Sequence, residues 1–142
     1  MEEATARHWL PDLSGIRVLV VEDDDDGRRM LFEVLEFAGA TVVAYENAYE
    51  ALDELNPFQP DVIICHLALP RLDGLGFLQA LRRNPDAKIR RIPMIAVTAY
   101  SDLYGPRELI GLRCEGYMAK PLSLERVCTA VQKLAIAGRS AA

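Results

Sequence analysis

The sequence predicts an α/β fold in which five parallel strands alternate with five helices. Short uninterrupted apolar runs recur along the 142 residues, and such runs are typical of strands that are buried on both faces of a parallel sheet. Between these runs, apolar residues recur at helical spacing and so form one face of a helix. The chain is 51% hydrophobic, which is enough for one compact core, and alternating strands and helices usually build a parallel sheet.

The first strand and helix are predicted over residues 18–21 and about 25–38. The helix follows from five apolar residues that share one face: Met30, Leu31, Val34, Leu35 and Ala38. Gly39 is suited to end it, because glycine readily adopts the left-handed conformation found after helix ends. The acids Asp24–Asp26 come at its start, where the positive end of the helix dipole favours negative charge.

The remaining elements follow from the same signals. They are strands over residues 41–44, 62–65, 94–97 and 116–119, and helices over about 48–55, 75–83, 106–112 and 124–136. Asn56–Pro57 should end the first of these helices, because proline lacks the backbone N–H that a helix needs. Gly105–Pro106 restricts the third to a short length, and Ser123 is positioned to cap the last. We expect Tyr45 and Tyr49 to pack against helices.

These elements place the domain at residues 16–137. Residues 1–15 are predicted to be a tether that packs loosely on the domain, and residues 138–142 to be a short tail. Three basic segments are interpreted as solvated helix faces and a loop: Arg28–Arg29, Arg82–Arg83 and Lys88–Arg91.

Right-handed crossovers would close these units into a flavodoxin-like, doubly wound five-stranded parallel sheet of strand order 2-1-3-4-5. Ligands bind such sheets beyond the carboxyl ends of the strands. Polar residues stand at four of those ends: Glu22 and Asp23 after the first strand, His66 after the third, Thr98 after the fourth and Lys120 after the fifth. An apolar core does not require these residues there, so we expect them to form one site.

Together these residues resemble the receiver domain of bacterial response regulators, a switch driven by phosphorylation. The resemblance covers residues 16–136 and rests on the strand-end residues and on the segment Pro60–Gly74. It implies that Glu22, Asp23 and the backbone carbonyl of Ala68 would hold Mg²⁺, which prefers hard oxygen ligands.

The resemblance also implies roles for three further residues. Thr98 would contact the phosphoryl group, Lys120 would neutralise its charge, and Tyr117 would move with Thr98 as a switch. His66 departs from the family, because its position is that of the aspartate that accepts the phosphoryl group. Imidazole cannot form an aspartyl phosphate. We therefore expect an atypical receiver that acts by protein–protein interaction, is not phosphorylated at the usual site and is not an enzyme.

Histidine at position 66 also changes the expected ion chemistry. Mg²⁺ should bind more weakly than to three acids, whereas imidazole suits Zn²⁺, Ni²⁺ or Cu²⁺, so that Glu22, Asp23 and His66 would form an adventitious transition-metal site. The two acids favour the imidazolium and Lys120 opposes it. If the acids dominate, the site should respond to pH.

Composition limits the partners. The net charge of −5 argues against nucleic-acid binding, no apolar run approaches a membrane span, and three cysteines without framework spacing indicate a reduced, cytoplasmic protein. No output domain follows residue 136, so we expect output by contact with a sensor histidine kinase or another signalling protein, or by homodimerisation. The expected contact face is the helix after Thr98, with Tyr100 and Tyr104, the strand at Tyr117 and the last helix.

Three alternatives stay open at this point. The chain would be a phosphorylatable receiver of a response regulator or hybrid histidine kinase if the histidine at 66 replaces a natural aspartate; residues 10–18 resemble the linker before receivers in such kinases. A haloacid-dehalogenase-like phosphatase would use Asp23–Asp25, Thr98 and Lys120, but the chain lacks its late acidic pair and its cap domain. A small-molecule sensor on the same scaffold is the third.

Overall fold

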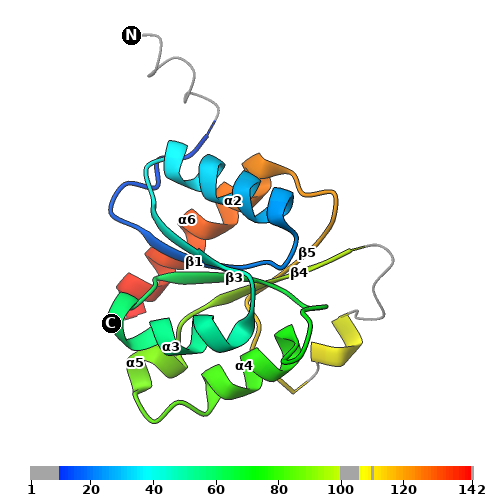
Figure 1. Ribbon diagram of the computed structural model, residues 1–142. Coiled ribbons are helices and arrows are strands. Elements are labelled where there is room, and N and C mark those ends of the chain that lie inside the picture. Colours follow the sequence, from blue (N-terminus) through cyan, green and yellow to red (C-terminus); the bar gives the residue numbers. More distant parts are fainter. Residues whose placement is uncertain (1–9, 100–105, 110, 142) are drawn as a thin grey trace, which may run out of the picture.

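The computed structural model describes residues 10–99, 106–109 and 111–141 (Figure 1). In chain order the elements are β1 (Arg17–Val21), α2 (Asp25–Phe37), β2 (Thr41–Tyr45), α3 (Ala48–Phe58), β3 (Val62–His66), α4 (Gly74–Arg82), α5 (Ala87–Arg90), β4 (Met94–Thr98), the 3₁₀ helix η1 (Pro106–Leu109), β5 (Gly116–Ala119) and α6 (Leu124–Ala141).

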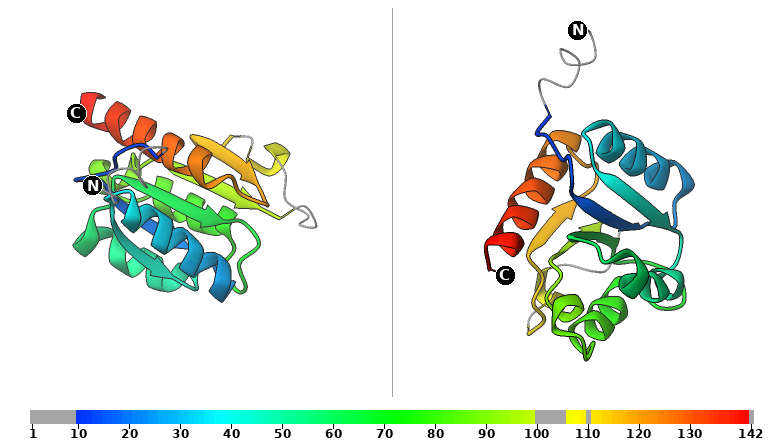
Figure 2. Two further views of the ribbon diagram at one scale, coloured as in Figure 1. Left: turned by 90° about the horizontal axis from the view of Figure 1, so that it is seen from above. Right: turned by 90° about the vertical axis from the view of Figure 1, so that its left-hand side faces the viewer.

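The five strands form one parallel sheet in the order β2-β1-β3-β4-β5, which confirms the predicted topology. Helices α2 and α6 cover one face of the sheet, and α3, α4 and α5 cover the other (Figures 1 and 2). Every residue of β3 and β4 is therefore buried, as the continuous apolar runs predicted. The edge strand β5 alternates between half-buried and exposed residues.

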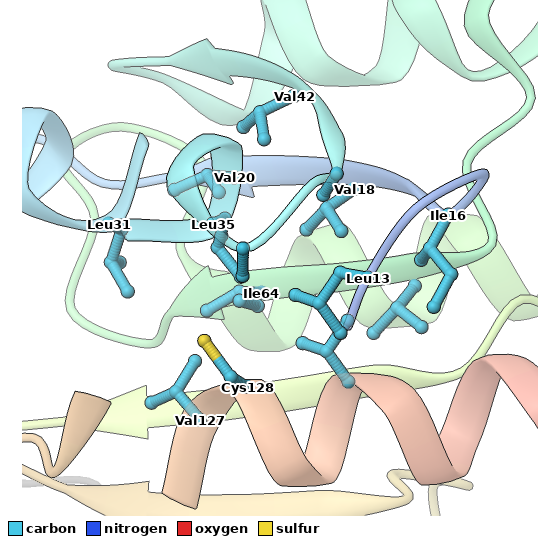
Figure 3. Close-up of a cluster of buried hydrophobic side chains, with 14 of the residues drawn as sticks. Leu13, Ile16, Val18, Val20, Leu31, Leu35, Val42, Ile64, Val127 and Cys128 are labelled. Atoms are coloured by element: carbon cyan, nitrogen blue, oxygen red, sulfur yellow. The ribbon is translucent and has the colours of Figure 1, made fainter. Parts of the chain in front are cut away.

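The core has two halves, one on each side of the sheet. Successive residues of a strand point to opposite faces, so Val18 and Val20 of β1 lie in one half while Leu19 and Val21 lie in the other. Figure 3 shows the first half, where side chains of β1 and β3 meet those of α2 and α6, including Leu35 and Cys128.

The tether and the tail both differ from the prediction. Leu13 is fully buried, and its N–H donates to the carbonyl of Ala38 at 2.8 Å, so the described part of the tether packs tightly. Helix α6 continues past the predicted end at Ile136 as far as Ala141. Near its end, the Arg139 side chain donates to the carbonyl of Gly15 at 2.6 Å, which holds the last turn against the domain.

Three predictions about the helices are wrong. Helix α3 includes Pro57 and ends at Phe58, because burial of the Phe58 ring and the left-handed cap at Gln59 outweigh one missing hydrogen bond in the last turn. Met30 is 53% exposed, so the buried stripe of α2 is narrower than its apolar residues suggested. Tyr49 is 50% exposed and lies beneath the Arg71 guanidinium, whose carbon is 5.4 Å from the ring centre.

The interpretation of the basic segments is also corrected. Residues 87–90 form the short helix α5 within the segment predicted as a loop, and the carboxylate of Asp86 caps it by accepting from the N–H of Lys88. The Arg82 side chain is only 12% exposed. It donates to the carbonyls of Arg90, Ile92 and Arg113 and to the Glu115 carboxylate, and so ties α4 to the segments on both sides of β4.

In the described part of the chain, no helix is both long enough and apolar enough to span a membrane. All three cysteines are free thiols. Burial raises the pKa of Cys128 to about 11 and raises that of Cys65 further, so both thiols are protonated at neutral pH.

Candidate functional site

The carboxyl ends of the parallel strands bring the predicted site residues to one edge of the sheet. His66 is the last residue of β3 and Thr98 the last of β4, while Glu22 follows β1 and Lys120 follows β5. Backbone bonds fix these ends in register, since the Glu22 N–H donates to the Tyr45 carbonyl at 3.0 Å and the Lys120 N–H to the Thr98 carbonyl at 2.8 Å.

Four of the predicted side chains meet at this edge. The His66 Nδ1 atom lies 3.0 Å from Glu22 Oε2 and 3.3 Å from Asp23 Oδ1. The Lys120 Nζ atom lies 2.6 Å from the other carboxylate oxygen, Glu22 Oε1. Each oxygen of Glu22 therefore has its own positive or hydrogen-donating partner. Both of these neighbours of Nδ1 are carboxylate oxygens, which only accept, so this nitrogen must carry the proton.

The four side chains differ in burial. Glu22 is 1% exposed and His66 is 9% exposed, whereas the Asp23 side chain is 38% exposed. The cluster is therefore closed on the side of the sheet and open to solvent at Asp23.

The charge of Glu22 depends on its partners. Burial alone would raise the pKa of this carboxyl, but hydrogen bonds from His66 and Lys120, together with the positive charge of His66, lower it from 4.5 to about 2. A buried carboxylate without such partners would be strongly destabilising. His66 and Lys120 thus hold an ionised carboxylate inside the fold and link the ends of β1, β3 and β5.

The other predicted residues lie near this edge, and their roles stay predictions. The Thr98 side chain is buried, and its hydroxyl donates to the carbonyl of Ala99 at 3.3 Å. Tyr117 is 36% exposed on β5, opposite Ala96, and Ala68 is half-buried just beyond His66. Tyr100 and Tyr104 lie outside the described residues.

Two further residues support the site, and of these Arg28 was not predicted to do so. Arg28 donates to the Glu22 carbonyl at 2.9 Å, which fixes the backbone that carries the buried carboxylate. Gly74 begins α4 so close to β3 that a Cβ there would lie 2.7 Å from the His66 carbonyl oxygen. The sequence signal for Arg28 was its place one turn into the helix that follows the acidic pair. Gly74 ends the segment Pro60–Gly74 on which the resemblance rests, directly after the N-cap Asp73.

The donor atoms of this cluster can be tested against the needs of a metal ion. Ligand atoms of Glu22, Asp23 and His66 all lie within 4.8 Å of one another. Mg²⁺ demands oxygen ligands in near-octahedral geometry. Here an imidazole nitrogen lies between the two carboxylates, where Mg²⁺ would need an oxygen, so the residues fit Mg²⁺ poorly.

Comparison with known proteins gives a consistent result. The response regulator receiver domain model matches residues 18–132. The polar-differentiation response regulator DivK of Brucella anthropi is 34% identical over 110 residues, which are 77% of this chain and 87% of DivK. The signal receiver domain of a signal transduction histidine kinase from Syntrophus aciditrophicus has a TM-score of 0.78 at 27% identity, covering 87% of this chain and 92% of that one.

The chemotaxis response regulator CheY4 of Vibrio cholerae has a TM-score of 0.74 at 25% identity, covering 84% of this chain and 98% of CheY4. The family match spans most of the domain, and the strand order and the acidic residues after β1 agree with it. This chain therefore belongs to the response regulator receiver domain family and is a receiver domain of two-component signalling.

Proposed function

We propose that this receiver domain signals without an aspartyl phosphate at position 66 and acts by binding another protein. The observation that carries the proposal is the place of the His66 ring, whose Nδ1 lies 3.0 Å from Glu22 and 3.3 Å from Asp23. An acyl phosphate needs a carboxylate nucleophile, and position 66 has none.

The electrostatics of the cluster support the same proposal. Receiver domains typically use their acidic residues to bind Mg²⁺, which offsets the charge of the phosphoryl group. Here His66 and Lys120 already neutralise Glu22, and the donor set fits Mg²⁺ poorly. In our proposal the ion pairs of Glu22 with His66 and Lys120 take the place of the Mg²⁺ ion and the phosphoryl group. These pairs hold the ends of β1, β3 and β5 in one arrangement.

The proposed partner is a sensor histidine kinase or another signalling protein, with a second copy of the chain as the alternative. We place the contact on the face formed by η1, β5 and α6. Two exposed apolar side chains on these elements support that choice, Tyr117 at 36% and Ile136 at 54% exposure. Aromatic and aliphatic side chains that are exposed in the free protein and become buried in a complex commonly anchor interfaces. The net charge of −5 favours a protein partner over nucleic acid.

Receiver domains are generally not enzymes, and we propose that this one is no exception.

The experiment measures self-association by sedimentation velocity and kinase binding by pull-down, each with and without acetyl phosphate and Mg²⁺. We expect binding that does not change with the phosphodonor and that Tyr117→Ala weakens. The matched control is Tyr49→Ala, which removes an exposed tyrosine ring from α3, outside the proposed face. Binding that requires the phosphodonor would overturn the proposal, and a larger loss in Tyr49→Ala than in Tyr117→Ala would overturn the proposed face.

A further inference from the structure

We infer that Glu22, Asp23 and His66 form a binding site for a borderline divalent transition-metal cation such as Zn²⁺, in place of a Mg²⁺ site. The inference concerns the same cluster as the proposed function and adds a ligand to it. It is carried by the identity, spacing and burial of the three donor atoms.

The spacing of the donor atoms matches a small tetrahedral ion. A tetrahedral Zn²⁺ with bonds of about 2.0–2.1 Å keeps its ligand atoms about 3.3–3.4 Å apart. The His66 Nδ1 atom lies 3.0 Å from Glu22 Oε2 and 3.3 Å from Asp23 Oδ1. All three ligand atoms lie within 4.8 Å of one another. An ion held by these atoms would displace the proton on Nδ1, which leaves to solvent, and would draw the two carboxylate oxygens together around it.

The nature of the donors selects the cation. An imidazole nitrogen with two carboxylate oxygens is a mixed set that suits Zn²⁺, Co²⁺ or Ni²⁺, whereas Mg²⁺ favours carboxylates, carbonyls and water. Three protein ligands would leave the fourth position to water. The exposure of Asp23 gives that position access to solvent.

Lys120 does not block this site, because the two oxygens of Glu22 serve different partners. Lys120 Nζ contacts Oε1 at 2.6 Å, while Oε2 faces His66. Glu22 can thus bind the ion through Oε2 and keep its bond to Lys120. A charged group that holds a ligating carboxylate in place is a common outer partner of metal sites. The exposed acids Asp24, Asp25 and Asp26 follow directly in sequence and add negative charge beside the cluster.

The test is isothermal titration of the whole chain with Zn²⁺ and with Mg²⁺ in phosphate-free buffer, together with the visible absorption of Co²⁺ as a report on coordination geometry. We expect one equivalent of Zn²⁺ to bind about 100-fold or more tightly than Mg²⁺, and Co²⁺ to give a tetrahedral spectrum. His66→Ala and Asp23→Asn should each weaken Zn²⁺ binding by more than the roughly 10- to 100-fold that loss of an outer partner costs.

Two control variants make the result specific. Asp26→Asn removes one exposed carboxylate from the same acidic run but not from the cluster, and it should leave the affinity within about twofold, since exposed charges are screened. His8→Ala removes the one other histidine of the sequence and should also leave it unchanged. Equal affinities for Zn²⁺ and Mg²⁺, or a loss caused by His8→Ala but not by His66→Ala, would overturn the inference. Because phosphoryl transfer is measured separately by mass, either proposal can fail while the other stands.

Discussion

Replacing His66 by aspartate should destabilise the protein in the absence of metal and make its stability depend on Mg²⁺. The partners of Glu22 lower its pKa from 4.5 to about 2, and one pKa unit corresponds to about 1.4 kcal/mol, so they favour the ionised carboxylate by ~3 kcal/mol. His66 and Lys120 share this effect. The substitution removes the share of His66 and adds a third carboxylate beside Glu22 and Asp23, so we expect a loss of about 2–4 kcal/mol in the free energy of unfolding.

Mg²⁺ should reverse most of this loss, because an aspartate at position 66 would complete an all-carboxylate site. A ligand at 100 times its dissociation constant stabilises the folded state by about 2.7 kcal/mol. The assay is urea denaturation at neutral pH, with and without Mg²⁺, on the unsubstituted chain, His66→Asp and His66→Asn. The asparagine variant has nearly the same shape as the aspartate variant but no added charge, so Mg²⁺ should not rescue it. If His66→Asp were as stable as the unsubstituted chain without Mg²⁺, the ion-pair account of the cluster would be refuted.

Three further predictions follow from the structure. Arg82→Ala should lower the free energy of unfolding by about 2–4 kcal/mol in urea, because it removes the bonds from this side chain to three carbonyls and to Glu115, of which only the Arg90 carbonyl and Glu115 keep a partner in Arg113. Arg82→Lys should not restore the stability, and stability equal to that of the unsubstituted chain would contradict this. Gly74→Ala should lower the free energy of unfolding by about 1–3 kcal/mol, because the new Cβ would push α4 away from His66. Gly138→Ala places its Cβ where nothing lies within 4 Å, so it should leave the stability unchanged or raise it by up to about 1 kcal/mol. Calorimetry that finds Gly138→Ala less stable than Gly74→Ala would contradict this packing. The pairing of Glu22 adds stability that is fully present above pH 4.5 and is lost as pH falls from there through about 2. In Glu22→Gln the free energy of unfolding should therefore depend less on pH over this range. The same pH dependence in the variant and the unsubstituted chain would argue against the pairing.

The fold was predictable because its signals are local and repeated. Each buried strand is a continuous apolar run, and right-handed crossovers leave few ways to order five of them. The errors fall where tertiary contacts decide the outcome. Pro57 stays in α3 because Phe58 is buried, and α6 runs on to Ala141 because Arg139 bonds to the Gly15 carbonyl. Neither contact can be read from residues close in sequence.

The site was predictable in its members but not in its connections. Parallel strands deliver Glu22, His66 and Lys120 to one edge, as expected. One carboxylate oxygen of Glu22 contacts His66 and the other contacts Lys120. This arrangement depends on side-chain rotamers that only the packed structure fixes. Arg82 shows the same limit, since its place in a basic pair suggested a solvated face, while distant carbonyls draw it inward.

The central claim is that position 66 accepts no phosphoryl group, and intact mass spectrometry after treatment with acetyl phosphate and Mg²⁺ tests it most directly. We predict no adduct on the unsubstituted chain at any time point. We predict the mass of one phosphoryl group on His66→Asp, provided that Thr98 and Lys120 are placed to receive it. A phosphoryl adduct on the unsubstituted chain that maps to His66 would contradict the claim.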